Sequence, residues 1–368
     1  MAIIVSEKIK VESSYGRNGD VRNDVSWAHP ELRDFWSAGN ADVVYMCCDE
    51  SLPKEKRKKR LEKMIKLSTE MLVSQGCDPF EGRDTTEAAG FGTMQAFQCA
   101  GCPEEPAGTE HQVYALIPSK KTRRKRPAIY FIMGGCFFMQ EPMLYPELLR
   151  WAKQFNAVVV TPRYSTLLDA QYPTQINECH AGYIWMQENA EMLGIDPDDV
   201  VLFGLSTGAQ LALSLAFRLK RYGITPRGCV LADPMIEDRG IYESSKIIKD
   251  SGDARLAHTM FMSYVGAENL GSNYVGPEAF PNHATVEECR GLCPIFLNVG
   301  ESDQDRDPVM EFASKCYAAK VPCSTHVWFG AAHATLWNSR GTPMSERFFQ
   351  NLYGDIRDCL AYDLRRKQ

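Results

Sequence analysis

Hydrophobic and polar positions follow one pattern from His111 to the end of the chain. Short apolar runs rich in β-branched residues alternate there with longer stretches whose apolar positions recur at helical spacing. The pattern predicts strands at 112–118, 128–133, 157–161, 200–205, 228–232, 294–299 and 324–329, and helices at 144–155, 176–192, 207–222, 308–319 and 345–363. Since strands that alternate with helices form a parallel sheet covered on both faces, we predict an α/β fold with a mostly parallel, doubly wound sheet.

The first 108 residues follow a different pattern. Apolar islands at 34–36, 43–46 and 94–97 lie in a polar background, and a helix is predicted from about Ser51 to Gly76. We therefore expect residues 1–108 to form a mostly helical cap, and residues 109–368 to form the domain that contains the sheet. A second part of the cap is expected within that domain, at about 236–288, where the predicted helices are irregular.

The composition is that of an ordinary globular protein. The chain has 368 residues, 44% hydrophobic and 24% charged, so it can bury a large core. Its net charge of -6 and pI near 5.8 argue against nucleic-acid binding as its main role. The N-terminus lacks the features of a signal peptide, and no apolar run reaches membrane-spanning length. We expect a cytoplasmic protein with no nucleic-acid partner and no membrane span.

The chain contains 13 cysteines, an odd and high number. In a reducing compartment most of them are expected to be small buried hydrophobic residues. The pairs Cys99 and Cys102, and Cys289 and Cys293, are spaced like metal ligands, but neither is followed by a partner pair at the spacing of a zinc site. We expect no metal and no cofactor.

The segment from Val200 to Gly208 carries the clearest chemical signal. An apolar strand enters it, Gly204 and Gly208 flank Ser206 at two-residue spacing, and a helix pattern follows. This is the arrangement of a nucleophile elbow, a sharp turn that projects a serine hydroxyl above the end of a strand. The backbone N–H of Thr207 would point into the same space, next to the positive end of the new helix.

A serine hydroxyl becomes a nucleophile only when a base removes its proton and an acid orients that base. Two later predicted strands end at suitable residues, the first before Asp303 and the second before His333. The order Ser206, Asp303, His333 is that of the α/β-hydrolase fold. Asp305 and Asp307 remain alternatives for the acid, although spacing from the strand end favours Asp303.

Other residues near these motifs have simpler interpretations. His326 alternates with its neighbours in a predicted strand, which favours a half-buried sheet residue, whereas His180 and His283 are interpreted as surface or packing residues. Cys136 has no evident basic neighbour, so a small packing residue is favoured over a reactive thiol.

With these motifs, the chain from about residue 110 to its end resembles the hormone-sensitive-lipase-like branch of the α/β hydrolases. That branch includes arylacetamide deacetylase and many bacterial carboxylesterases. Its His-Gly-Gly-Gly loop corresponds here to 133–136, its Gly-Asp-Ser-Ala-Gly elbow to 204–208, and its Gly-x-x-Asp acid loop to 300–303. Its Tyr-Arg-Leu-Ala-Pro-Glu segment is present in outline, in residues 164–169 followed by Tyr172-Pro173.

The resemblance implies an α/β-hydrolase fold with an N-terminal helical cap. It implies a serine carboxylesterase that acts on small to medium acyl esters through an acyl-enzyme intermediate, with a small-molecule ester as partner. Ser206 would be the nucleophile, His333 the general base and then acid, and Asp303 the residue that orients it. The oxyanion hole would consist of the backbone N–H groups of Gly134, Gly135 and Thr207. A homodimer is left open.

The loop departs from the family pattern at two positions. Met133 replaces a histidine whose hydrogen bonds it cannot make, and Cys136 replaces the third glycine. We therefore expect the loop to be held by packing, without a side-chain network. One of Phe137 and Phe138 is expected to line the acyl pocket, the alternative being packing between sheet and helix. An amidase, lactonase or peptidase with the same triad, or a binding protein on a hydrolase scaffold, remain alternatives.

Overall fold

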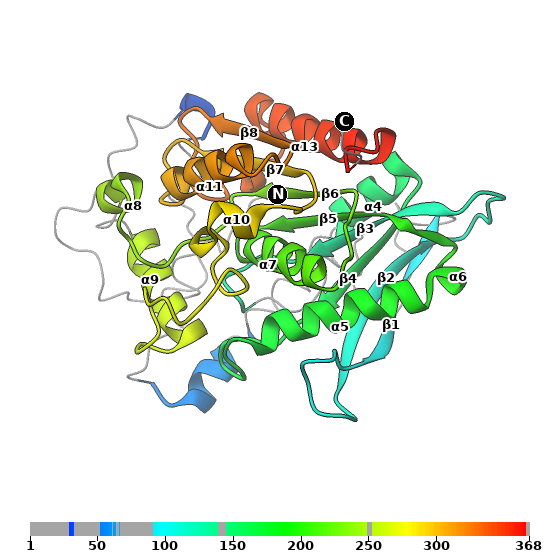
Figure 1. Ribbon diagram of the computed structural model, residues 1–368, viewed down its shortest axis with the longest axis horizontal. Helices are drawn as coiled ribbons and strands as arrows, with labels where there is room; N and C mark the ends of the chain where they lie inside the picture. Colours follow the sequence, from blue (N-terminus) through cyan, green and yellow to red (C-terminus); the bar gives the residue numbers. More distant parts are fainter. Residues whose placement is uncertain are drawn as a thin grey trace.

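The computed structural model describes residues 29–32, 52–60, 62–63, 66, 91–138, 145–248 and 252–365. An eight-stranded sheet forms the centre of this part of the chain (Figure 1). Its strands are β1 (Gly92–Ala100), β2 (Glu110–Pro118), β3 (Arg126–Ile132), β4 (Val158–Arg163), β5 (Ile195–Leu205), β6 (Gly228–Ala232), β7 (Ile295–Gly300) and β8 (Cys323–Trp328). Their order in the sheet is β1-β2-β4-β3-β5-β6-β7-β8.

The sheet is mostly parallel, as the alternation of strands and helices predicted. β1 pairs with β2, and β2 with β4, in the antiparallel direction. Every later pair in the order is parallel, from β4 with β3 to β7 with β8. In parallel strands that follow one another in a sheet, the carboxyl ends meet at one edge, which is where ligands bind in folds of this type.

Helices cover both faces of the sheet. The longer ones are α4 (Tyr145–Phe155), α5 (Thr174–Glu188), α7 (Thr207–Arg221), α9 (Gly252–Val265), α11 (Arg306–Ala318) and α13 (Pro343–Ala361). The shorter ones are α6 (Ala190–Leu193), α8 (Glu243–Ile248), α10 (Val286–Cys289), α12 (Thr335–Asn338) and the 3₁₀ turns η2 (Pro30–Leu32) and η3 (Pro281–His283). Figure 1 shows α5 and α7 in front of the sheet.

The core has two parts because side chains of a strand alternate between the two faces of a sheet. In β3, Tyr130 and Ile132 belong to the cluster that includes residues of α5, α7 and α11. Ile129 and Phe131 point the other way, into the cluster that includes residues of α4 and α13. Burial on both sides explains why the central strands are continuous apolar runs.

The boundary between cap and sheet differs from the prediction. Residues 1–108 were expected to lie outside the sheet, but Gly92–Ala100 pairs with β2 along its whole length. This edge strand buries Met94 and Cys99 while most of its other residues are partly or fully exposed, so its apolar signal is diluted. Residues 54–60 are helical as expected. Most of the predicted cap before residue 91 lies outside the described residues.

The segment between β6 and β7 is helical and irregular, as its sequence indicated, and contains α8, α9, η3 and α10. Figure 1 shows α8 and α9 beyond the end of the sheet toward which the central strands point. Nowhere in the described ranges is a helix both long and apolar enough to cross a membrane.

Candidate active site

Ser206 lies between the end of β5 and the start of α7, in a strained backbone conformation. Its φ of 57° and ψ of -125° lie outside the regions that a serine normally adopts. A Cβ on Gly204 would lie 2.3 Å from the carbonyl oxygen of Gly208, and one on Gly208 would lie 2.1 Å from that of Ile132. The turn therefore requires glycine at both positions, which explains the spacing seen in the sequence.

Three side chains from separate segments form one hydrogen-bonded chain. Ser206 Oγ lies 2.8 Å from His333 Nε2, and His333 Nδ1 lies 2.8 Å from Asp303 Oδ2. Asp303 follows β7 and His333 follows β8, so the neighbouring strand ends bring them beside the elbow. Both Ser206 and Asp303 are buried. The geometry can pass a proton from the serine to the imidazole while the carboxylate holds the other ring nitrogen.

The two alternative acids have other surroundings. Asp305 is buried without a hydrogen bond from His333 in the described structure, and burial raises its pKa well above the ordinary value. Asp307 accepts a hydrogen bond from the backbone N–H of Ser244 and pairs with Arg306. Of the three candidates, Asp303 is the one in contact with the histidine.

Carboxylates control the charge of His333. Burial opposes protonation of the ring, but the carboxylates of Asp303, Asp233 and Asp305 outweigh this and raise the pKa of His333 to about 10. An imidazolium at this position is therefore strongly favoured. This is the charge state that a general base reaches after it has taken the serine proton.

The loop after β3 approaches the elbow through its backbone. A Cβ on Gly134 would lie 2.2 Å from the carbonyl oxygen of Leu205 and 3.1 Å from Ser206 Cβ, so only glycine fits. Among the described residues, the backbone N–H groups of Gly134, Gly135 and Thr207 donate no hydrogen bond. These three N–H groups are the ones that the sequence analysis assigned to an oxyanion hole, and that assignment stays a prediction.

The loop is not held by packing alone, contrary to the expectation from Met133. The hydroxyl of Tyr164 donates to the carbonyl oxygen of Met133 at 2.6 Å. The N–H of Phe137 donates to Thr207 Oγ1 at 3.4 Å, which ties the loop to the start of α7. Cys136 and Phe137 both have positive φ, 58° and 60°, where glycine is normally favoured. A short polar network thus holds a strained loop in place.

Phe137 and Phe138 are both fully buried. The ring of Phe137 stacks on Tyr264 of α9, with centroids 4.4 Å apart, and meets Tyr164 edge to face. Packing between the loop and α9 is therefore one function of Phe137. A place in the acyl pocket stays a prediction for either residue.

The sequence pattern did not indicate three residues of this site. Met235 Sδ lies 3.5 Å from Ser206 Oγ, Tyr164 holds the loop, and Asp233 lies beside the histidine. Asp233 and Met235 follow the end of β6, and Tyr164 follows the end of β4. Their position after strand ends is a signal that could have identified them, and Tyr164 also begins the family segment found at 164–169.

The remaining histidines have other partners. His180 Nδ1 lies 3.1 Å from Glu104 Oε2, and His283 Nε2 lies 2.7 Å from Asp238 Oδ1. Both rings are buried, which agrees with packing residues. His326 is exposed, contrary to the half-buried position expected, and stacks on Trp328 with centroids 3.9 Å apart. It lies on β8, the last strand at one edge of the sheet.

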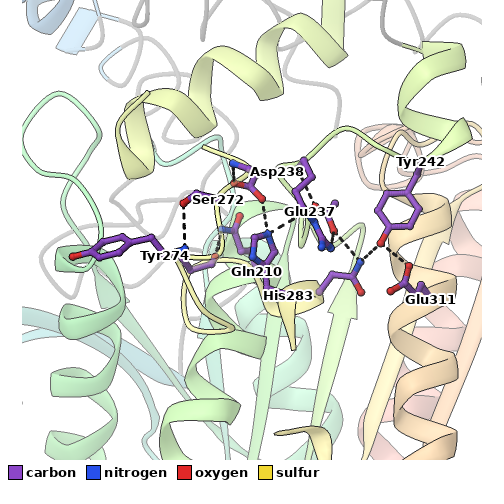
Figure 2. Close-up of polar contacts among 12 residues, drawn as sticks. Gln210, Glu237, Asp238, Tyr242, Ser272, Tyr274, His283 and Glu311 are labelled. Carbon is purple, nitrogen blue, oxygen red and sulfur yellow. Dashed lines mark hydrogen bonds and ion pairs between the residues drawn. The ribbon is translucent and has the colours of Figure 1, made fainter. Parts of the chain in front are cut away.

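Two groups of described residues have side chains close enough to share a metal ion, and protein donors already occupy both. The first group consists of Glu237, Asp238 and His283 (Figure 2). Asp238 accepts a hydrogen bond from the N–H of Gly271 at 2.6 Å, and Glu237 accepts one from the side chain of Asn282 at 3.0 Å. The same network reaches α11 through Tyr242 and Glu311. It anchors the segment between β6 and β7.

The second group consists of Cys102, Glu104 and His180. Its carboxylate accepts from Tyr222 at 2.8 Å and pairs with Arg221 at 3.3 Å. A cation would have to compete with this arginine. We assign no metal to either group.

Known proteins with similar sequences include esterases and lipases. Esterase LipU of Mycobacterium tuberculosis is 27% identical over 223 residues, which are 59% of this chain and 72% of the relative. Bovine arylacetamide deacetylase is 31% identical over 112 residues, 29% of this chain and 28% of the relative. Human hormone-sensitive lipase is 31% identical over 113 residues, 30% of this chain but 10% of the relative. These relatives support an assignment to the carboxylic ester hydrolases.

Solved structures agree on the fold. A bacterial heroin esterase superimposes with a TM-score of 0.75 at 22% identity, covering 91% of this chain and 99% of the other. Esterase LipW of Mycobacterium marinum superimposes with a TM-score of 0.71 at 20% identity, covering 92% of this chain and 98% of the other. Residues 129–336, more than half of the chain, match the family described as alpha/beta hydrolase fold. The chain therefore belongs to the α/β-hydrolase family, in the branch that resembles hormone-sensitive lipase and arylacetamide deacetylase.

Proposed function

We propose that this protein is a serine carboxylesterase that hydrolyses small to medium acyl esters through an acyl-enzyme intermediate. The observation that carries the proposal is the continuous hydrogen-bonded chain from Ser206 through His333 to Asp303. The N–H groups of Gly134 and Gly135 would add the second requirement of acyl transfer, donors for an oxyanion.

The reaction would begin when His333 Nε2 takes the proton of Ser206 and the serine oxygen attacks the ester carbonyl. The oxyanion accepts hydrogen bonds from the N–H groups of Gly134, Gly135 and Thr207, each of which is worth about 2.7 to 4 kcal/mol in comparable sites. The imidazolium then protonates the leaving alcohol. Water attacks the acyl group with His333 again as base, and Asp303 keeps the Nδ1 proton in place throughout.

Several finer features belong to the same proposal. One of Phe137 and Phe138 would form a wall of the acyl pocket, and the cap would determine which leaving groups enter. An amide or lactone substrate would use the same triad, so esters and amides with matched acyl groups should be compared directly. A cytoplasmic location and a homodimer stay predictions, which cell fractionation and sedimentation can check.

The decisive experiment is hydrolysis of nitrophenyl esters from acetyl to dodecanoyl by the wild type and by Ser206→Ala. We expect turnover with a chain-length optimum, and a loss of about 10⁴-fold or more in kcat without the serine. Ser214→Ala is the matched control, since Ser214 is a buried serine of α7, the helix that follows Ser206, and should leave kcat within about threefold.

Labelling with a fluorophosphonate separates the alternatives. A folded wild-type protein that neither hydrolyses an ester nor labels at Ser206 would contradict the proposal and favour a binding protein. Labelling at Ser206 without ester hydrolysis would instead favour a peptidase or amidase with a narrow substrate range.

A further inference from the structure

We propose that Asp233 is a positioning residue for His333: its carboxylate joins the histidine loop to the strand that carries the acid, and it places a second negative charge beside the imidazole. The consequence for turnover rests on the proposed function. The effect on the histidine itself does not.

Asp233 directly follows β6 and accepts hydrogen bonds from two different segments. Oδ1 accepts from the N–H of Gly300 at 3.2 Å, and Oδ2 accepts from the N–H of Ala334 at 3.0 Å. Gly300 is the last residue of β7, where the turn to Asp303 begins, and Ala334 is the neighbour of His333. One carboxylate therefore links the two segments that must stay in register for the histidine and its acid to meet.

The backbone around these contacts is strained. Asp233 has a φ of 46° and Ala334 a φ of 56°, both in the left-handed region that is unfavourable for a residue with a Cβ. Such conformations persist only where the surroundings impose them. The hydrogen bond between Asp233 and the N–H of Ala334 connects the two strained residues, so it holds the histidine loop in a conformation that it would otherwise leave.

The charges in this pocket are coupled. Burial, followed by the charge of Asp303, raises the pKa of Asp233 to about 7, and His333 opposes this shift. Asp303, Asp305 and His333 are the titratable groups that act on the pair of Asp233 and His333. A buried carboxylate facing another carboxylate is costly unless donors or a cation compensate it. The two N–H groups and the imidazolium provide that compensation, and in return Asp233 favours the imidazolium.

The test is titration of the imidazole of His333 by NMR in the wild type, Asp233→Asn and Asp233→Ser. The signal is assigned by its absence in His333→Gln. Both Asp233 variants remove the negative charge. The serine variant keeps a hydroxyl that can accept one hydrogen bond, so it replaces the asparagine variant in the titration if the latter does not fold. We expect the pKa of His333 to fall in each folded variant because a nearby negative charge is lost.

Kinetics give the second measurement. In the same variants the plateau value of kcat at high pH should fall about 10- to 100-fold with KM nearly unchanged, and the acid limb of the kcat/KM profile should move to lower pH. Asp355→Asn is the control, since it neutralises a half-buried carboxylate, next to Asn298 and Asn351, and should leave the His333 titration unchanged.

The outcomes separate the two proposals. If the titration of His333 is the same in a folded Asp233 variant as in the wild type, Asp233 is only structural and the inference is wrong, whatever the activity. If the wild type hydrolyses no ester but the titration shifts, the proposed function fails and the inference on Asp233 stands.

Discussion

The hydroxyl of Tyr164 donates a hydrogen bond to the carbonyl oxygen of Met133, 2.6 Å away. Tyr164 follows β4 and Met133 follows β3, so this bond joins the ends of two adjacent strands just before the loop turns toward Ser206. Because both partners are buried, neither can turn to water instead. The bond therefore fixes the position of the main chain just before Gly134 and Gly135.

Tyr164→Phe should therefore lower activity by loosening the loop. Loss of the hydroxyl leaves a buried carbonyl unsatisfied, at a cost of about 1 to 3 kcal/mol in the free energy of unfolding. We expect kcat to fall about tenfold as the oxyanion donors lose their position. Tyr183→Phe, a buried tyrosine in the same core cluster, is the control and should affect stability alone. Equal kcat in Tyr164→Phe and the wild type would contradict this role.

Asp303→Asn should lower kcat about 10⁴-fold, because an amide can no longer hold the histidine in the tautomer that accepts the serine proton. Asp307→Asn is the matched control. Its carboxylate accepts a hydrogen bond from the N–H of Ser244 and pairs with Arg306, and it lies outside the chain of Ser206, His333 and Asp303. We therefore expect kcat to stay within about threefold of the wild type. Steady-state kinetics on one nitrophenyl ester decides between them, and a larger loss in Asp307→Asn would mean that the acid is assigned wrongly.

Activity should increase with pH. His333 accepts a proton only when neutral, and its pKa is raised from 6.5 to about 10 because carboxylates outweigh burial. We expect kcat/KM to rise across this interval and to level off only near its upper end. The stability that the imidazolium contributes is fully present below pH 6.5 and is lost as the pH rises through about 10. A plateau of kcat/KM already at neutral pH would contradict the prediction.

Asp355→Asn should stabilise the protein in alkaline solution. Burial raises the pKa of Asp355 from 3.8 to about 6, so the folded state loses stability as the pH rises from 3.8 through 6. At higher pH the cost is at most about 3 kcal/mol, and asparagine removes it while keeping an oxygen that accepts from Asn298 and Asn351.

Chemical unfolding of Asp355→Asn and the wild type at two pH values measures this difference. Asp358→Asn, an exposed residue of the same helix, should change the free energy of unfolding by less than about 0.5 kcal/mol. A gain that is the same at acidic and alkaline pH would show that ionisation of Asp355 is not the cause.

The sequence allowed the main elements and the three residues of the hydrogen-bonded chain to be predicted, for a physical reason. Buried parallel strands are apolar throughout, and Ser206, Asp303 and His333 each follow the end of one, so the fold brings them to the same edge. Gly204 and Gly208 added a local requirement that a short pattern reveals.

Other features depend on partners that lie far apart in the sequence. β1 was missed because an edge strand needs apolar residues on one face alone. Nothing local to Tyr164 says that its hydroxyl will meet the carbonyl of Met133. The helix predicted at 176–192 ends at Glu188, and the separate short helix α6 follows it. The contact of Tyr164 with Met133 joins segments that are 31 residues apart, so no local pattern reveals it.

The glycines at the site lie against main-chain atoms, which has a consequence for how such a protein can diverge. The space beside Gly134, Gly204 and Gly208 is closed by carbonyl groups, and a carbonyl cannot move aside as a side chain can. Mutation can therefore not enlarge or reshape the reacting centre through these positions. New substrate preferences have to arise at other side chains, such as Met235 after β6, which lies 3.5 Å from Ser206 Oγ.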